Sequence, residues 1–251
     1  MWESLEVLFL GPREWGPLAR IRGLWKVEAL FWAHYFWRFA PLDIWLQART
    51  LGRPFGDFRY GETLWCSGAE ILKEAGVGPE DHLVDLGCGR GKMVFLARIL
   101  TGARATGVEL LPGYLYVARR IARWLKLDKV RFLGQDFADV DLRKATVVYV
   151  AGSIFADETR EDLKCLVDDL APGSQWLSVS WPMEHPSLVL ESSNEYLFSW
   201  GRETVFRYRV VSRDDESAPS SHPCAASADS DPSALDLPPE TSPTGPDSTD
   251  P

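Results

Sequence analysis

The stretch VDLGCGRGK, residues 84–92, lies between a short apolar run and a segment with helical spacing. Its glycines at positions 87, 89 and 91 allow a ligand to approach the main chain closely, because glycine has no side chain and accepts positive φ angles. A strand followed by a glycine loop and a helix is typical of a nucleotide-type site, in which the ligand lies at the helix N-terminus. The stretch therefore predicts both a fold class and a bound ligand.

Strand-like and helix-like runs alternate on both sides of this loop, which predicts βαβ units and a mostly parallel sheet. Near the end, residues 195–211 (EYLFSWGRETVFRYRVV) predict two strands that turn at Trp200 and Gly201. We therefore expect an α/β, Rossmann-like fold: a mostly parallel seven-stranded sheet with a C-terminal antiparallel hairpin, helices on both faces and an N-terminal helical cap. The other expected strands are 82–86, 105–109, 129–133, 146–150 and 175–180, and the expected helices are 92–100, 157–170 and one beginning at Pro112.

Composition divides the chain into three regions. Residues 1–65 hold seven of the eleven tryptophans and predict the cap, and residues 66–211 hold the alternating strand-like and helix-like runs of the α/β domain. Residues 212–251 are rich in Ser, Pro and Asp, and they predict a disordered acidic tail.

The charges of the chain are unevenly distributed. Nine of the 36 acidic residues follow Arg213, so the preceding part carries 27 acidic and 27 basic residues. This balance gives no direct signal of nucleic-acid binding. The four cysteines and four histidines show no metal-ligand spacing, so no metal site is predicted, and the scattered cysteines favour a cytoplasmic location.

The residues around the loop argue against a phosphate ligand. Lys92 stands where a dinucleotide fingerprint has its third glycine, and no Gly-Lys-Ser/Thr of a phosphate loop follows. Asp85 immediately precedes Leu86 and the first glycine, and a carboxylate at this point repels phosphate but attracts a cation. S-adenosylmethionine (SAM) has an ammonium, a sulfonium and no phosphate, so it fits these charges.

Two further acids follow the next two expected strands. Glu109 is placed to accept both ribose hydroxyls, as acids do about 20 positions past the loop in dinucleotide sites. Asp136 can accept from the adenine amino group, and Phe137 can pack on the ring. Each acid alone could be a helix cap or a surface acid. The three acids and the loop together predict a SAM site.

These residues resemble the class I, seven-strand methyltransferases over about residues 58–211. YGET (60–63) resembles the loop that closes over the cofactor in the non-SET histone lysine methyltransferases of the telomeric-silencing type. GVELLPGYLYVARR (107–120) is similar to the mitochondrial seven-strand lysine methyltransferases that modify membrane carriers and ATP synthase subunits. The resemblance implies a cofactor-binding set of Tyr60, Thr63, Asp85, Gly87, Cys88, Gly89, Gly91, Glu109, Leu110, Asp136 and Phe137.

The part that would recognise the acceptor departs from that pattern. Ala151, Gly152 and Ser153 stand where the telomeric-silencing family has Asn-Asn-Phe, and the basic segment that this family uses for nucleosomes is absent. The methyl acceptor therefore stays open. A protein lysine is the first hypothesis and a small molecule or lipid the second. A scaffold that binds the cofactor without activity is the third.

A lysine acceptor must lose its proton before it attacks, which costs roughly 4–5 kcal/mol at pH 7. An apolar, aromatic wall would lower that cost. The candidate catalytic or wall residues are Tyr60, Glu62, Tyr149, Phe155 and Trp181. Each aromatic residue could equally be an ordinary core residue, and Glu62 could equally be a surface acid.

Residues 24–46 (LWKVEALFWAHYFWRFAPLDIWL) mix aromatic with charged side chains. Charges such as Lys26, Glu28 and Arg38 argue against a membrane span, which needs about 20 mostly apolar residues. Three alternatives stay open for this segment: a lid that packs over the sheet and shapes the acceptor pocket, an interfacial helix in contact with a membrane surface, and a partner-binding helix.

Overall fold

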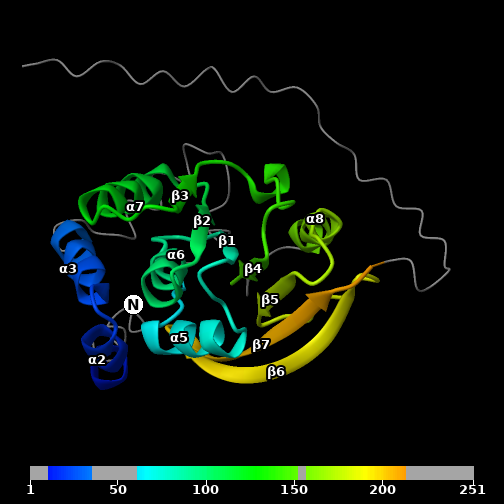
Figure 1. Cartoon of the computed structure of the whole chain (residues 1–251), viewed down its shortest axis with the longest axis horizontal. Coiled ribbons are helices and arrows are strands. Elements are labelled where there is room, and N and C mark those ends of the chain that lie inside the picture. The colour runs from blue at the N-terminus through cyan, green and yellow to red at the C-terminus, as the bar shows by residue number, and fades with distance from the viewer. Residues whose placement is uncertain (1–10, 36–60, 152–156, 213–251) are drawn as a thin grey trace, which may run out of the picture. The chain divides into compact units, whose positions relative to one another are not determined.

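The computed structural model describes residues 11–35, 61–151 and 157–212. Within them, seven strands form one sheet in the order β3-β2-β1-β4-β5-β7-β6 (Figure 1). The strands are β1 (His82–Leu86), β2 (Arg104–Val108), β3 (Val130–Leu133), β4 (Val147–Val150), β5 (Gln175–Val179), β6 (Leu188–Phe198) and β7 (Gly201–Val210).

The first five strands pair in parallel, β7 pairs antiparallel with β5, and β6 pairs antiparallel with β7 at the edge of the sheet. This arrangement confirms the predicted Rossmann-like sheet with its terminal hairpin. The hairpin is longer than expected, since β6 begins at Leu188 and the prediction began at residue 195. Most residues of β6 up to Glu195 are exposed at the edge of the sheet, so they lack the alternating pattern that would predict a strand.

Helices cover both faces of the sheet (Figure 1), as predicted. Helix α6 (Lys92–Leu96) follows the glycine loop and continues into a π-helical turn, η2 (Ala97–Thr101), so the expected helix over 92–100 changes its hydrogen-bonding pattern halfway. With α5 (Trp65–Glu74) and α7 (Pro112–Trp124), α6 packs in one hydrophobic cluster on one sheet face. Helix α8 (Asp157–Val167) contributes to a second cluster on the opposite face, and it ends before the predicted residue 170.

Two helices precede this domain: α2 (Gly11–Arg20) and α3 (Leu24–Tyr35). Leu24, Val27 and Phe31 of α3 lie at helical spacing and are buried in the same cluster as α6 and α7. The rings of Phe31 and Phe95 meet edge to face, with centroids 5.9 Å apart. Residues 24–35 therefore belong to the core of the domain on one side of the helix.

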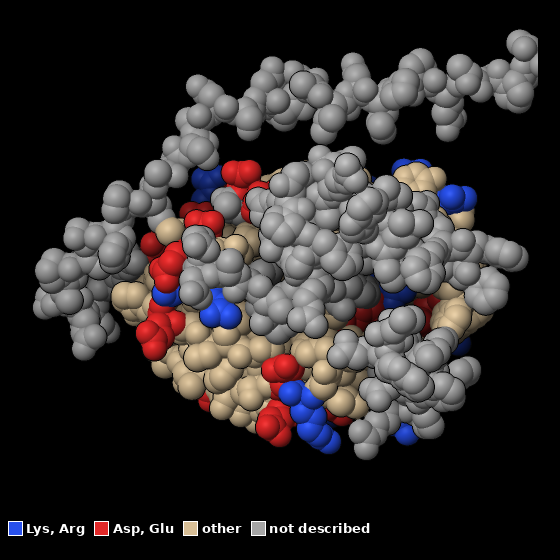
Figure 2. Space-filling model, turned by 180° about the vertical axis from the view of Figure 1, so that it is seen from behind, with Lys and Arg blue, Asp and Glu red and all other residues tan. Residues whose placement is uncertain are grey.

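The other side of α3 is exposed, with Trp25 at 57% and Trp32 at 48% of their maximal accessible surface. Residues 36–60 lie outside the described residues, so the lid stays a prediction, as do the boundaries of the cap and the tail. No helix among the described residues has the length and apolarity needed to cross a bilayer. On the face in Figure 2, acidic and basic side chains lie beside each other around a broad uncharged region, in keeping with the balanced charge.

Candidate functional site

The glycine loop folds back over the end of β2. Gly87, Gly89 and Gly91 have φ angles of 77°, 52° and 83°, in the left-handed region that glycine adopts without strain. The amide groups of Gly87 and Cys88 both donate to the carbonyl of Val108, each at 2.9 Å. The loop therefore presents bare main chain at the carboxyl edge of the sheet.

Close packing around this loop excludes any side chain at two positions. A Cβ on Gly91 would lie 2.5 Å from the ring of Phe132. A Cβ on Gly107, in the neighbouring strand β2, would lie 2.6 Å from Sγ of Cys88. Both distances are far below van der Waals contact, so the loop can occupy this place only because these residues are glycine.

Asp85 lies near the end of β1, between Gly107 of β2 and Tyr149 of β4, and is only 3% exposed. Burial raises the pKa of its carboxyl to about 8, and the negative charge of Glu109 adds to the shift. Among the described residues, no lysine or arginine forms an ion pair with it. A cationic ligand would supply the missing counter-charge, which fits the predicted role of Asp85 toward an ammonium group.

Glu109 fixes the loop as well as facing the predicted ribose site. Its Oε2 accepts a hydrogen bond from the amide of Gly89 at 2.8 Å, and its Oε1 accepts one from the amide of Leu111 at 2.9 Å. Burial raises the pKa of this carboxyl, and these backbone donors partly oppose the shift. Each carboxylate oxygen can accept a second hydrogen bond, so the ribose hydroxyls can still be accommodated.

The third acid, Asp136, follows β3 and is half-buried, as are Leu110 and Phe137. Phe137 opens the short 3-10 helix η3 (Phe137–Asp139) and packs partly against the second hydrophobic cluster. The structure thus places all three predicted acids at the carboxyl ends of adjacent parallel strands, β1, β2 and β3. Their individual roles toward the cofactor stay predictions.

Two residues of the YGET stretch, which precedes α5, contact residues at the carboxyl edge of the sheet. The hydroxyls of Thr63 and Tyr149 are 2.7 Å apart, and burial strongly raises the pKa of Tyr149, so this phenol stays neutral. Glu62 is 6% exposed and pairs with Arg90 and Lys92 of the glycine loop. The alternative that Glu62 is a surface acid is therefore wrong.

The aromatic candidates for an acceptor wall divide into two groups. Tyr149 and Trp181 are both buried, at 1% and 7% exposure, in the two hydrophobic clusters. The indole N–H of Trp181 has no hydrogen-bond partner within the described part of the chain, and the Arg160 guanidinium lies 5.9 Å from its ring. Tyr60 and Phe155 lie outside the described residues.

Three charged residues at this site were missed by reasoning from the sequence. Arg90 lies in the glycine loop and Lys92 follows it directly as the first residue of α6, so both charges were visible in the sequence. Glu14, on α2, approaches Lys92 with a Nζ–Oε2 distance of 3.8 Å. Because Glu14 lies more than 70 residues before the loop in the sequence, no local pattern predicted this contact.

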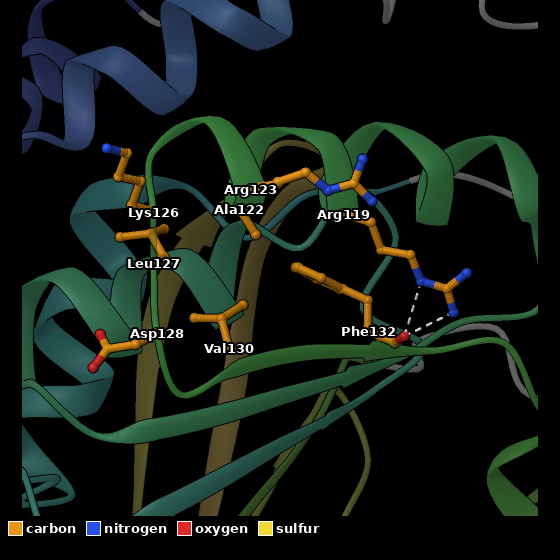
Figure 3. A pocket seen from close by; sticks show the side chains of 8 residues that line it. All are labelled: Arg119, Ala122, Arg123, Lys126, Leu127, Asp128, Val130 and Phe132. Atoms are coloured by element: carbon orange, nitrogen blue, oxygen red, sulfur yellow. Dashed lines mark hydrogen bonds between the residues drawn. The ribbon is translucent and has the colours of Figure 1, made fainter.

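A separate pocket of about 430 Å³ lies between α7 and β3 (Figure 3). Arg119 lies over this pocket and donates two hydrogen bonds to the carbonyl of Phe132, at 3.1 and 2.8 Å. The lining combines cationic and aliphatic side chains and includes none of the three acids. It comprises Arg119, Ala122, Arg123, Lys126, Leu127, Asp128, Val130 and Phe132.

Comparison with known proteins places the chain in a family. The family model described as "Histone methylation protein DOT1" matches residues 46–199, more than half of the chain. A histone-lysine N-methyltransferase, H3 lysine-79 specific, from Mycosarcoma maydis is 33% identical over 150 residues, which cover 53% of this chain and 19% of the relative. The protein of the same description from Cryptococcus neoformans is 29% identical over 135 residues, covering 48% and 21%. The chain thus spans about a fifth of the length of these curated relatives.

Solved structures show the same fold. An RNA methyltransferase from Salinibacter ruber in complex with S-adenosyl-L-homocysteine superposes with a TM-score of 0.50 at 28% identity, covering 61% of this chain and 94% of that one. TrmN from Thermus thermophilus gives a TM-score of 0.52 at 17% identity, covering 66% and 53%. The fold is that of the class I methyltransferases, and the chain belongs to the DOT1 histone methylation protein family.

Proposed function

We propose that this protein is a SAM-dependent methyltransferase whose acceptor is the side-chain amine of a protein lysine. The observation that carries the proposal is the buried carboxyl of Asp85, which has no cationic partner within the described part of the chain and lies beside a bare glycine loop. Support for transfer to lysine comes from the family, since the curated relatives are described as histone-lysine N-methyltransferases.

The residues at the carboxyl edge fit the parts of the cofactor. Asp85 would hold the ammonium, Glu109 would orient the ribose, and Asp136 would accept from the adenine amino group. The glycines allow the adenosine to approach the main chain closely. When bound, SAM supplies an electrophilic methyl group on a sulfonium that leaves as a neutral thioether.

The chain itself contributes alignment and a dry environment for the acceptor. Holding the acceptor and the methyl group in the reactive alignment can lower the activation barrier by roughly 7–11 kcal/mol at best. A lysine amine that enters an apolar site has its pKa lowered by desolvation, which favours the neutral nucleophile. Trp181, which follows β5 and belongs to the same hydrophobic cluster as residues of α8, is one described aromatic candidate for that environment, and Tyr149 of β4 is the other. Tyr60 and Phe155 stay candidates in the same role.

The test is incubation of a cell lysate with the protein and SAM that carries a deuterated methyl group, followed by mass spectrometry. Labelled lysine in a protein is the expected product, and an Asp85→Asn variant should produce much less of it at the same SAM concentration. Label in the small-molecule, lipid or RNA fraction alone would replace the lysine acceptor by another. Cofactor binding without label in any fraction would favour the scaffold.

The cellular setting is a separate proposal. We infer a cytoplasmic location, as the scattered cysteines favour, and cell fractionation would test it. A membrane-surface contact through residues 24–46 has no support from the family relatives. Flotation of the protein with liposomes would test that contact directly.

A further inference from the structure

The glycine loop carries two cations next to a site proposed for a cationic cofactor. Arg90 and Lys92 belong to the loop itself, and their side chains are only 19% and 11% exposed. Positive charge at this place should repel a ligand of like charge, and partial burial weakens the screening by water. The loop therefore needs a compensating negative charge if it is to bind SAM.

Glu62 supplies that charge from outside the loop. Its Oε1 accepts from the guanidinium of Arg90, and its Oε2 lies 3.0 Å from Nζ of Lys92. One buried carboxylate thus pairs with both cations of the loop. Aromatic rings support the same side chains, since Arg90 lies 5.1 Å from the ring of Phe31 and Lys92 lies 5.1 Å from that of Trp65.

Glu14 of α2 adds a second carboxylate and ties the N-terminal helices to the loop. Its Oε2 is 3.8 Å from Nζ of Lys92. Its two oxygens also accept the amides of Trp65 and Cys66, at 3.1 and 3.2 Å, at the N-terminus of α5. Among the described residues, two cations and two carboxylates therefore form a cluster with no net charge, drawn from α2, residue 62, the glycine loop and the start of α6.

We propose that Glu62 is a positioning residue that neutralises the loop cations and so sets the preference of the site for SAM over its demethylated product. The inference rests on the proposed function. SAM carries one positive charge more than S-adenosylhomocysteine (SAH), because SAH lacks the sulfonium. Removing the charge of Glu62 leaves a net positive loop, which should weaken the binding of SAM more than that of SAH.

The test is calorimetric titration of the full chain with SAM and with SAH at low salt. We expect Glu62→Gln to weaken SAM binding about fivefold more than SAH binding. The difference should shrink in roughly 0.5 M salt, where the Debye length is only a few ångströms. The double variant E62Q/R90Q restores the charge of the cluster and should return the ratio of the two affinities to that of the wild type.

Two further variants separate charge from structure. Glu62→Asp keeps the charge and should keep the ratio. Glu74→Gln removes an acid that accepts from Tyr196 and Asn194 on β6, and it should also leave the ratio unchanged. Equal weakening of both ligands by Glu62→Gln, or no change in either, would overturn the inference and leave the proposed function standing. A wild-type protein that binds neither ligand would overturn both.

Discussion

Two sites on this protein carry opposite charges. The carboxyl edge of the sheet has Asp85, Glu109 and Asp136 around the glycine loop, whereas the pocket beside α7 has Arg119, Arg123 and Lys126. The pocket is a cavity of about 430 Å³, and its three cations outnumber its one acid, Asp128, so its charges suit an anion. The edge has the charge and the bare main chain that a cationic adenosine derivative needs. The comparison indicates that the class of ligand is better inferred from the charge of a site and from the access of the ligand to the main chain. The presence of a cavity is a poorer guide.

The largest expected effect concerns the bare main chain of the acidic edge. Gly91→Ala adds a Cβ that would overlap Phe132 at a left-handed φ of 83°, so we expect the free energy of unfolding to fall by about 3 kcal/mol. Gly173→Ala is the matched control, since its φ is 91° and its surroundings are open. It should cost only about 1–2 kcal/mol. Urea denaturation measures both, and equal losses would show that the overlap relaxes freely.

The second effect concerns the negative charge that distinguishes the acidic edge from the basic pocket. Asp85→Asn keeps the shape of the side chain but removes the carboxylate, and it should weaken SAM binding about 10- to 100-fold. Isothermal titration calorimetry measures the change. Asp141→Asn removes an exposed acid that pairs with Arg143 and should leave the affinity unchanged. Wild-type affinity in Asp85→Asn would remove the assignment of Asp85 to the ammonium.

Glu109→Gln should have a smaller effect on the same edge. The amide can still accept one backbone N–H, but its own NH₂ group then faces the second donor, so the bond to Gly89 of the loop or the bond to Leu111 is lost. We expect SAM binding to weaken about five- to tenfold. A competition assay with SAH would detect the loss, and an unchanged affinity would show that this acid serves neither the ribose nor the loop.

The basic pocket should show the smallest effect. The double variant R123Q/K126Q removes two cations that line the pocket, and both residues lie away from the three acids. We expect SAM affinity to change by less than about twofold, because exposed charges at this distance are screened. A marked loss of SAM binding in this variant would mean that the pocket and the edge do not have separate roles.

Much of the fold could be predicted because buried parallel strands read as short apolar runs. His82–Leu86 and Val147–Val150 are almost wholly buried, and the sequence marks them clearly. The edge strand β6 was only partly predicted, since most of its first residues are exposed. The π-helical turn at Ala97–Thr101 was not predicted, because its residues are as compatible with an α-helix.

The site shows the same division. Asp85, Glu109 and Asp136 were predictable because each follows or ends a recognisable strand, and parallel strands bring their carboxyl ends together. Glu14 was not predicted, and Glu62 was predicted only as a candidate site residue without its ion pairs, since the contacts of both acids with Arg90 or Lys92 join segments distant in sequence. The tertiary packing of the chain brings these acids to Arg90 and Lys92, and no local sequence pattern predicts that contact.

The most direct test of the acidic edge is calorimetry at pH 7 with SAM, ATP and NAD⁺, in two buffers of different ionisation enthalpy. The Asp85 carboxyl has a pKa of about 8 without ligand, so it is mostly protonated at pH 7 and must ionise to pair with an ammonium. SAM should therefore bind with net release of protons, and more tightly as the pH rises toward 8. ATP and NAD⁺ should not bind. Binding of ATP or NAD⁺ at the glycine loop, or SAM binding without proton release, would contradict the account.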